Sequence, residues 1–243
     1  MDQLDVIDVS TGELVGQVPF YNGEEIAEMV DVAFAAQPRW ERVPTFERGQ
    51  VLYKFCDLVD ERREDIAMFV AKEMGKPILQ ARAETTYAAE IGRANIEVGK
   101  HLYGQVLQDS SEGYENHSVF VKREALGVIA CIIPFNYPAE LTMQKIVPAL
   151  LMGNTCIVKA DNQAACCVKL IIDLAHEDFD AAREKLQLAR SAEPEFAVIH
   201  EALGMTLEAL GDKQGALDSY RAALRADPTL LISGLAVERL GGE

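Results

Sequence analysis

The sequence is poor in basic residues. Its 243 residues include 23 Lys and Arg against 39 Asp and Glu, which gives a formal net charge of −16 at pH 7. A protein that binds nucleic acid or an anionic membrane surface usually has the opposite balance, because Lys and Arg bind the phosphate groups. The composition therefore predicts neither nucleic acid nor a membrane as a partner, and it indicates an acidic, solvated surface.

Targeting signals and metal-binding patterns are also missing. The first ten residues, MDQLDVIDVS, contain neither a basic region nor an apolar one, and no apolar stretch is long enough to span a membrane. The five cysteines are odd in number and lack the spacing of metal ligands. We expect a cytoplasmic protein with reduced thiols and no metal site.

Helical periodicity dominates the first hundred residues. Apolar residues recur at helical spacing over residues 23–37, 61–74 and 78–101, and in a helix that begins after Thr45. We expect the Thr45 hydroxyl to cap that helix. We also expect Gly-Lys-Pro at 75–77 to end the helix over 61–74. Charges of alternating sign on these helices indicate solvated outer faces.

The period changes to that of β-strands from residue 118. Segments 118–124 and 127–133 are rich in β-branched residues, and a further strand is predicted over 154–160. Helices are predicted over 138–152 and 164–175. Because 127–133 is apolar throughout, we expect it to lie in a parallel sheet with helices on both faces. The β-α-β-α order predicts an α/β fold, the opening of a doubly wound sheet.

An internal repeat follows. Residues 177–194 align with residues 211–228 at an offset of 34 residues, with Asp, three alanines and the final proline at equivalent places. A period of 34 residues with small residues at fixed positions is typical of tetratricopeptide (TPR) repeats. We therefore predict an all-α segment of TPR helical hairpins over 176–243, with one complete repeat at 197–230.

One complete repeat is fewer than a stable repeat array usually needs. We expect the helix over 164–175 to serve as the missing first half of the preceding repeat. Its apolar stripe consists of Cys167, Leu170, Ile171 and Leu174. Such a short array predicts a small groove that binds a protein or peptide partner weakly.

Three segments carry a resemblance to a known family. They are EMGKP (73–77), ALGVIACIIPFNYP (125–138) and PALLMGNTCIVK (148–159). In this order and at this spacing, they make residues 1–175 resemble the N-terminal part of the NAD(P)-dependent aldehyde dehydrogenases. The resemblance implies a partial fold of that family, with helices followed by the start of a Rossmann-like parallel sheet. It also implies oxidation of an aldehyde to a carboxylic acid with NAD or NADP.

Asn136 is the candidate catalytic residue. It matches the family's oxyanion-binding asparagine, and a fixed amide donor stabilises the negative charge that develops on an aldehyde oxygen under nucleophilic attack. An alternative from the residues alone is that Asn136 only caps the helix that follows it.

The candidate cofactor-binding residues come from the same resemblance. The backbone of Ile132, Ile133 and Pro134 and the ring of Phe135 would line the nicotinamide side, and Lys159 would bind the adenosine ribose. The family usually has a glutamate where this chain has Asn162, which weakens ribose binding in principle and leaves NAD against NADP undecided. Asp161 could replace that acceptor, but it lies one position away.

The family's nucleophile and base are missing from the sequence. No Gly-Gln-x-Cys segment occurs in the 243 residues. We expect burial to raise the thiol pKa of Cys131 and Cys156 and so make them unreactive. Cys166 and Cys167 lie near a helix start, which would lower their pKa, but no histidine or glutamate partner is evident. The residues therefore predict a truncated, inactive enzyme segment joined to a short TPR.

Three alternatives stay open at this point. The chain could be a protein-protein interaction module that uses the TPR helices, with the α/β part as a scaffold. Another polypeptide could supply the missing half, in which case the protein is an oligomer. The fusion could also be a disrupted reading frame without a selected function.

Overall fold

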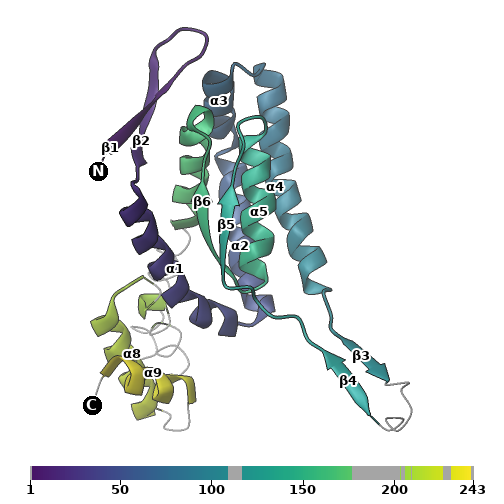
Figure 1. The fold of residues 1–243 in the computed structure, drawn as a ribbon, viewed down its shortest axis with the longest axis vertical. Coiled ribbons are helices and arrows are strands. Elements are labelled where there is room, and N and C mark those ends of the chain that lie inside the picture. The colour runs from purple at the N-terminus through teal and green to yellow at the C-terminus, as the bar shows by residue number, and fades with distance from the viewer. Residues whose placement is uncertain are drawn as a thin grey trace. The chain divides into compact units, whose positions relative to one another are not determined.

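The computed structural model describes residues 2–108, 117–176, 203, 206–208, 210–226 and 231–241. The chain divides into two units, residues 1–172 and 173–243. The elements of the first unit (Figure 1) are β1 (Asp2–Ile7), β2 (Leu14–Phe20), α1 (Gly23–Arg42), α2 (Thr45–Glu61), α3 (Arg63–Met74), α4 (Ile78–Lys100), β3 (Gln105–Gln108), β4 (Ser118–Val121), β5 (Val128–Ile132), α5 (Pro138–Leu151), β6 (Thr155–Lys159) and the short 3-10 helix η1 (Asn162–Ala164). A helix over residues 165–176 follows.

Helix α4 is the centre of the helical packing. It contacts α2, α3 and α5. Its buried face is made mainly of small residues, so the neighbouring helices approach closely: Ala81, Glu84, Thr85, Ala88, Ala89, Gly92, Ile96 and Gly99. A Cβ atom on Gly92 would lie 2.7 Å from the Cys56 sulfur, which explains the glycine at that point.

Two predictions about helix ends were wrong. Helix α1 continues past Gln37 and through Pro38 to Arg42, and the Trp40 indole donates a hydrogen bond of 2.7 Å to the Leu150 carbonyl near its end. That contact to α5 stabilises the last turn in spite of the proline. Thr45 does not cap α2: the N-cap is Pro44, and no side chain caps this end. By contrast, α3 ends as expected at Gly75, whose φ of 69° suits glycine.

The parallel pair β5–β6 confirms the predicted β-α-β order. Val128 pairs with Thr155 and Ile132 pairs with Lys159, and α1 and α5 each contact both strands. The prediction that the strand over 127–133, now β5, is buried on both faces was wrong. In β5 only Cys131 is buried, while the Ile132 side chain is 65% exposed. Within the described residues the sheet has two strands, so each has one unpaired edge.

Two antiparallel hairpins were not predicted as such. β1 pairs with β2, and β3 pairs with β4, so the segment that begins at Ser118 belongs to a hairpin and not to the parallel sheet. In the first hairpin Val6 and Val18 pack with Ala165 and Cys166 in one buried cluster. The helix over 165–176 thus begins in the core of the first unit. This placement gives no support to its expected role as a repeat helix.

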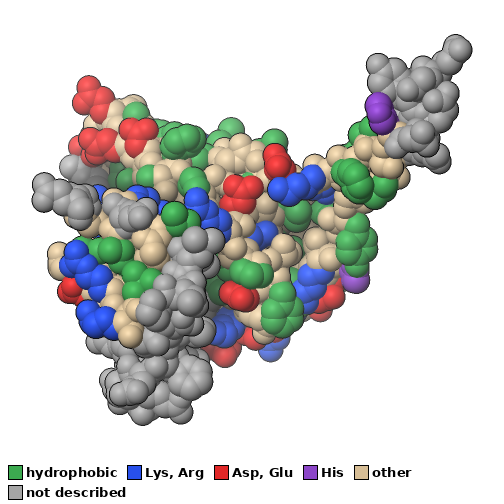
Figure 2. Space-filling view, turned by 90° about the horizontal axis from the view of Figure 1, so that it is seen from below, with side chains coloured by type: hydrophobic (Ala, Val, Ile, Leu, Met, Phe, Trp, Pro, Cys, Tyr) green, Lys and Arg blue, Asp and Glu red, His purple; other side chains and the backbone are tan. Residues whose placement is uncertain are grey.

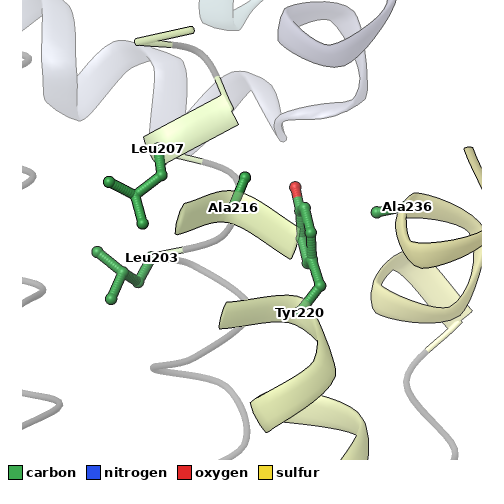
Figure 3. Packing of buried hydrophobic residues seen from close by; sticks show 5 residues of the cluster. All are labelled: Leu203, Leu207, Ala216, Tyr220 and Ala236. Atoms are coloured by element: carbon green, nitrogen blue, oxygen red, sulfur yellow. The ribbon is translucent and has the colours of Figure 1, made fainter. Parts of the chain in front are cut away.

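The second unit contains α8 (Lys213–Ala226) and α9 (Leu231–Gly241), which contact each other. Tyr220 of α8 lies between Leu203 and Leu207 on one side and Ala236 of α9 on the other (Figure 3). The predicted first copy of the repeat, residues 177–194, lies outside the described residues, as does Pro228. Neither half of the 34-residue alignment is therefore tested in full.

The surface carries both signs of charge. On the face drawn in Figure 2, Lys and Arg side chains are interspersed with acidic and hydrophobic ones. Among the helices that the structure describes, none is long and apolar enough to cross a membrane.

Candidate functional site

The candidate site lies at the carboxyl end of the parallel pair. Ile132 and Lys159 are register partners, and the Ile133 amide donates a hydrogen bond of 2.9 Å to the Lys159 carbonyl. Ile133 is buried, so its side chain belongs to the core and its backbone is the part that borders the strand end. Pro134 and Phe135 follow in an exposed loop, with Phe135 49% exposed. The structure thus brings the five predicted cofactor-binding residues to one edge of the sheet.

Asn136 lies in the same loop and is exposed. Tyr137 holds the N-cap position of α5, and its own side chain makes no capping hydrogen bond. The alternative role of Asn136 as a helix cap was therefore wrong. The carboxamide makes no hydrogen bond to the part of the chain that the structure describes.

A buried ion pair lies behind this loop. The Lys76 ammonium is 2.5 Å from a Glu84 carboxylate oxygen, and these side chains are 10% and 0% exposed. Lys76 also donates to the Asn136 carbonyl at 2.8 Å. The second Glu84 oxygen accepts a hydrogen bond of 2.9 Å from the Ala139 amide in the first turn of α5. The backbone that carries Asn136 is therefore connected to α4 by charged groups.

Neither member of this pair was predicted from the sequence. A signal was present: Glu84 falls on the buried face of α4 at helical spacing with Ala81 and Ala88. A carboxylate in a row of small residues is rarely buried without a partner. Lys76 belongs to the motif EMGKP, whose charged residues were not assigned a contact.

Asp161 is already engaged in local structure. One of its carboxylate oxygens accepts a hydrogen bond of 3.0 Å from the Gln163 amide, which caps η1. Lys159 and Asn162 are exposed on either side of it. The end of the site where ribose binding was predicted therefore has one exposed cation and one exposed amide.

Cys166 and Cys167 have a carboxylate partner that the sequence analysis did not find. The buried Glu73 accepts their backbone N–H groups at 2.8 Å and 3.2 Å. Burial and the nearby Glu73 raise the pKa of the Cys166 thiol to about 12 and raise that of Cys167 well above its ordinary value. The expectation that the helix start lowers these pKa values was wrong, because burial outweighs the helix dipole. Both thiols are held in their protonated form.

Cys131 and Cys156 lie on the same face of adjacent strands. A hydrogen bond from the Cys156 thiol lowers the pKa of Cys131, so the expectation of a raised pKa from burial was wrong for this residue. The same hydrogen bond, together with burial, raises the pKa of Cys156, as expected. Among the described residues, no group of His, Cys, Asp and Glu has the arrangement of a metal site.

Comparisons with known proteins match the first three quarters of the chain. The sequence profile described as "Aldehyde dehydrogenase family" matches residues 1–182. Glutarate-semialdehyde dehydrogenase of Pseudomonas putida is 31% identical over 172 residues, which are 70% of this chain and 35% of that protein. The NADP(+) succinate-semialdehyde dehydrogenase of Escherichia coli is 31% identical over 175 residues, 72% of this chain and 36% of that protein. The chain thus spans about a third of the length of these relatives.

Solved structures give the same result. The NADP-dependent glyceraldehyde-3-phosphate dehydrogenase of Bacillus halodurans, crystallised with NADP, superposes with a TM-score of 0.70 at 31% identity. The superposition covers 73% of this chain and 38% of that one. The lactaldehyde dehydrogenase of Escherichia coli superposes with a TM-score of 0.68 at 28% identity, over 73% of this chain and 36% of that one.

Proposed function

The chain belongs to the aldehyde dehydrogenase family, and on this basis we propose that residues 1–175 retain a site for NAD or NADP and for a small aldehyde. One observation carries the proposal. The exposed carboxamide of Asn136, the backbone at Ile132 and Ile133, and the Lys159 side chain share one end of the β5–β6 pair. A bound dinucleotide would supply the hydride acceptor there. The relatives and solved structures named above are dehydrogenases, two of them described as NADP-dependent.

Each residue has a distinct role in this proposal. Asn136 donates its amide N–H to the aldehyde oxygen as negative charge develops on it. Lys159 binds the ribose hydroxyls, and Phe135 with the adjacent backbone borders the nicotinamide. Asn162 replaces the family's usual acidic residue, so we expect weaker ribose binding than in a complete enzyme.

We further propose that these 243 residues are catalytically inactive alone. The chain has no Gly-Gln-x-Cys segment, and Cys166 and Cys167 are buried with raised pKa values beside Glu73. A thiol in its protonated form is a poor nucleophile. The unpaired edges of β5 and β6 suit the addition of further strands from a second polypeptide that carries the missing groups.

Incubation of the purified chain with NAD or NADP and a panel of aldehydes should give no formation of reduced nucleotide above the rate without protein. The panel includes succinate and glutarate semialdehydes, and absorbance at the wavelength of the reduced nicotinamide follows the reaction. The reason is that the family's Gly-Gln-x-Cys nucleophile is missing, and that Cys131, whose pKa is lowered, is buried. Turnover by the wild type that Asn136→Ala abolishes would contradict the proposed inactivity.

Titration with NAD and NADP should raise the thermal midpoint of unfolding and change the fluorescence of Trp40, since a ligand that binds the folded state stabilises it. Lys159→Met should weaken binding about tenfold or more, because it removes a charge-assisted hydrogen bond worth about 1.5–3 kcal/mol. Lys122→Met, which changes an exposed lysine paired with Glu124, is the matched control and should leave the affinity unchanged.

A second proposed function is protein or peptide binding through TPR helices. It is supported by buried residues at the positions that the repeat assigns to close helix contact, Ala216, Tyr220 and Ala223 on α8. In this proposal the first unit is a scaffold. If neither nucleotide changes the thermal midpoint or the fluorescence of the wild type, protein interaction becomes the better account of the chain.

A further inference from the structure

We propose that Lys76 and Glu84 are positioning residues for Asn136: Lys76 holds the Asn136 carbonyl and Glu84 holds the Ala139 amide, so that the Asn136 carboxamide is presented at the strand end. The inference rests on the proposed oxyanion role of Asn136. It concerns two residues that touch neither substrate nor cofactor in the proposed function.

Lys76 holds the loop at Asn136 itself. Its ammonium donates to the Asn136 carbonyl at 2.8 Å and lies 2.5 Å from a Glu84 oxygen. The same nitrogen is 3.9 Å from the centre of the Tyr137 ring, within the range of a cation–π contact. One cation thus contacts two consecutive loop residues and the carboxylate of a neighbouring helix. An ammonium has three N–H donors, and the ammonium of Lys76 is surrounded by Glu84, the Asn136 carbonyl and the Tyr137 ring.

Glu84 holds the other end of the loop. Its second oxygen accepts the Ala139 amide at 2.9 Å, at the N-terminus of α5. No side chain caps α5 from within its own sequence. Glu84 therefore serves as a cap supplied by another helix, and its negative charge is favourable at this end of the helix dipole. The segment from Asn136 to Ala139 is thus held at one end by Lys76, in the connection between α3 and α4, and at the other end by Glu84 of α4.

The energetics favour positioning over stability as the role of this pair. Burial of two opposite charges costs about as much free energy as their attraction returns, and apolar residues of similar volume often stabilise a protein equally well. The fold therefore does not require charges at Lys76 and Glu84. Charged hydrogen bonds do, however, set the direction of the groups that they join, which apolar packing does not.

The test measures backbone order at Asn136 and Tyr137 by NMR relaxation on the full chain, without cofactor. The wild type should give order parameters of about 0.85, the value of rigid backbone. The double variant Lys76→Met/Glu84→Gln removes both charges, so no buried carboxylate is left alone. We expect its order parameters at these two positions to fall below about 0.6, while the thermal midpoint stays near that of the wild type.

Lys54→Met, at an exposed lysine of α2, is the matched control and should change neither quantity. Order parameters that stay near about 0.85 at Asn136 and Tyr137 in a folded double variant would overturn the proposal. The wild type provides a test even if the double variant does not fold: order parameters below about 0.6 there would also overturn it. Because no cofactor is added, failure of the wild type to bind NAD or NADP would affect the proposed function and leave this result unchanged.

Discussion

Replacement of Arg48 by methionine should lower the free energy of unfolding by about 2–4 kcal/mol. Arg48 is buried in α2, where it donates to the Leu151 carbonyl at 2.8 Å, to the Glu41 carbonyl at 3.0 Å and to the Val43 carbonyl. These oxygens lie at or beside the C-terminal ends of α5 and α1, where carbonyl groups lack partners within their own helix. The contact to Leu151 is buried and the contacts to Glu41 and Val43 are partly buried. A fully buried acceptor that loses its donor costs about 1–3 kcal/mol, and a partly buried one costs less because water replaces the donor.

Chemical denaturation followed by circular dichroism would measure the loss. Arg82→Met is the matched control. Arg82 makes a bidentate hydrogen-bonded ion pair with Glu64, but both side chains are about half exposed. We expect that change to cost less than about 1 kcal/mol. Equal losses in the two variants would show that the carbonyl contacts of Arg48 contribute no more than a surface ion pair.

Stability should fall as the pH rises, through the titration of Glu73. Burial raises the pKa of this carboxyl to about 7 in the folded chain, from 4.5 in the unfolded chain, against the opposing effect of the amide donors of Cys167 and Cys166. Because the folded pKa is the higher one, the folded state binds more protons between these values. The contribution of Glu73 is therefore fully present below pH 4.5 and is lost as the pH rises through 7.

The free energy of unfolding should fall by about 3 kcal/mol from well below pH 4.5 to well above pH 7. Between pH 5.5 and 8 the fall should be about 2 kcal/mol. Glu73→Gln places an uncharged amide where the protonated carboxyl stands. The free energy of unfolding of this variant, minus that of the wild type, should rise with pH by the same amount. Denaturation curves at several pH values measure it. A difference that is constant with pH would show that the pKa of Glu73 is the same in the folded and unfolded states, against the raised value expected from burial.

The fold of the first unit was largely readable from the sequence where the signal is local. Helical spacing, Gly75 and the β-α-β order predicted α3, α5 and the parallel pair within a few residues. The hairpin β1–β2 was missed because only Val6 and Val18 in it are buried, so its alternation is weak. Its partners, Ala165 and Cys166, are distant in sequence, and periodicity carries no information about such contacts.

The site shows the same division. The resemblance placed Asn136 and Lys159 in a motif, and the strand register explains why they end at one edge of the sheet. The burial of the Glu73 and Glu84 carboxylates was not predicted, because a carboxylate on a helix normally indicates a solvated face. Only the tertiary structure shows that Glu73 faces the amides of Cys166 and Cys167, or that Glu84 faces Ala139.

The buried cluster that joins Val6 and Val18 to Ala165 and Cys166 has a consequence for synthesis on the ribosome. Residue 165 is translated 147 residues after residue 18, which takes roughly 7–30 s at about 5–20 residues per second. During that interval Phe69 of α3 is the apolar neighbour of the hairpin that is already made, while Ala165 and Cys166 are still missing from the cluster. The N-terminal strands are thus among the first parts to emerge, and their burial is completed only after residue 166 has been added to the chain.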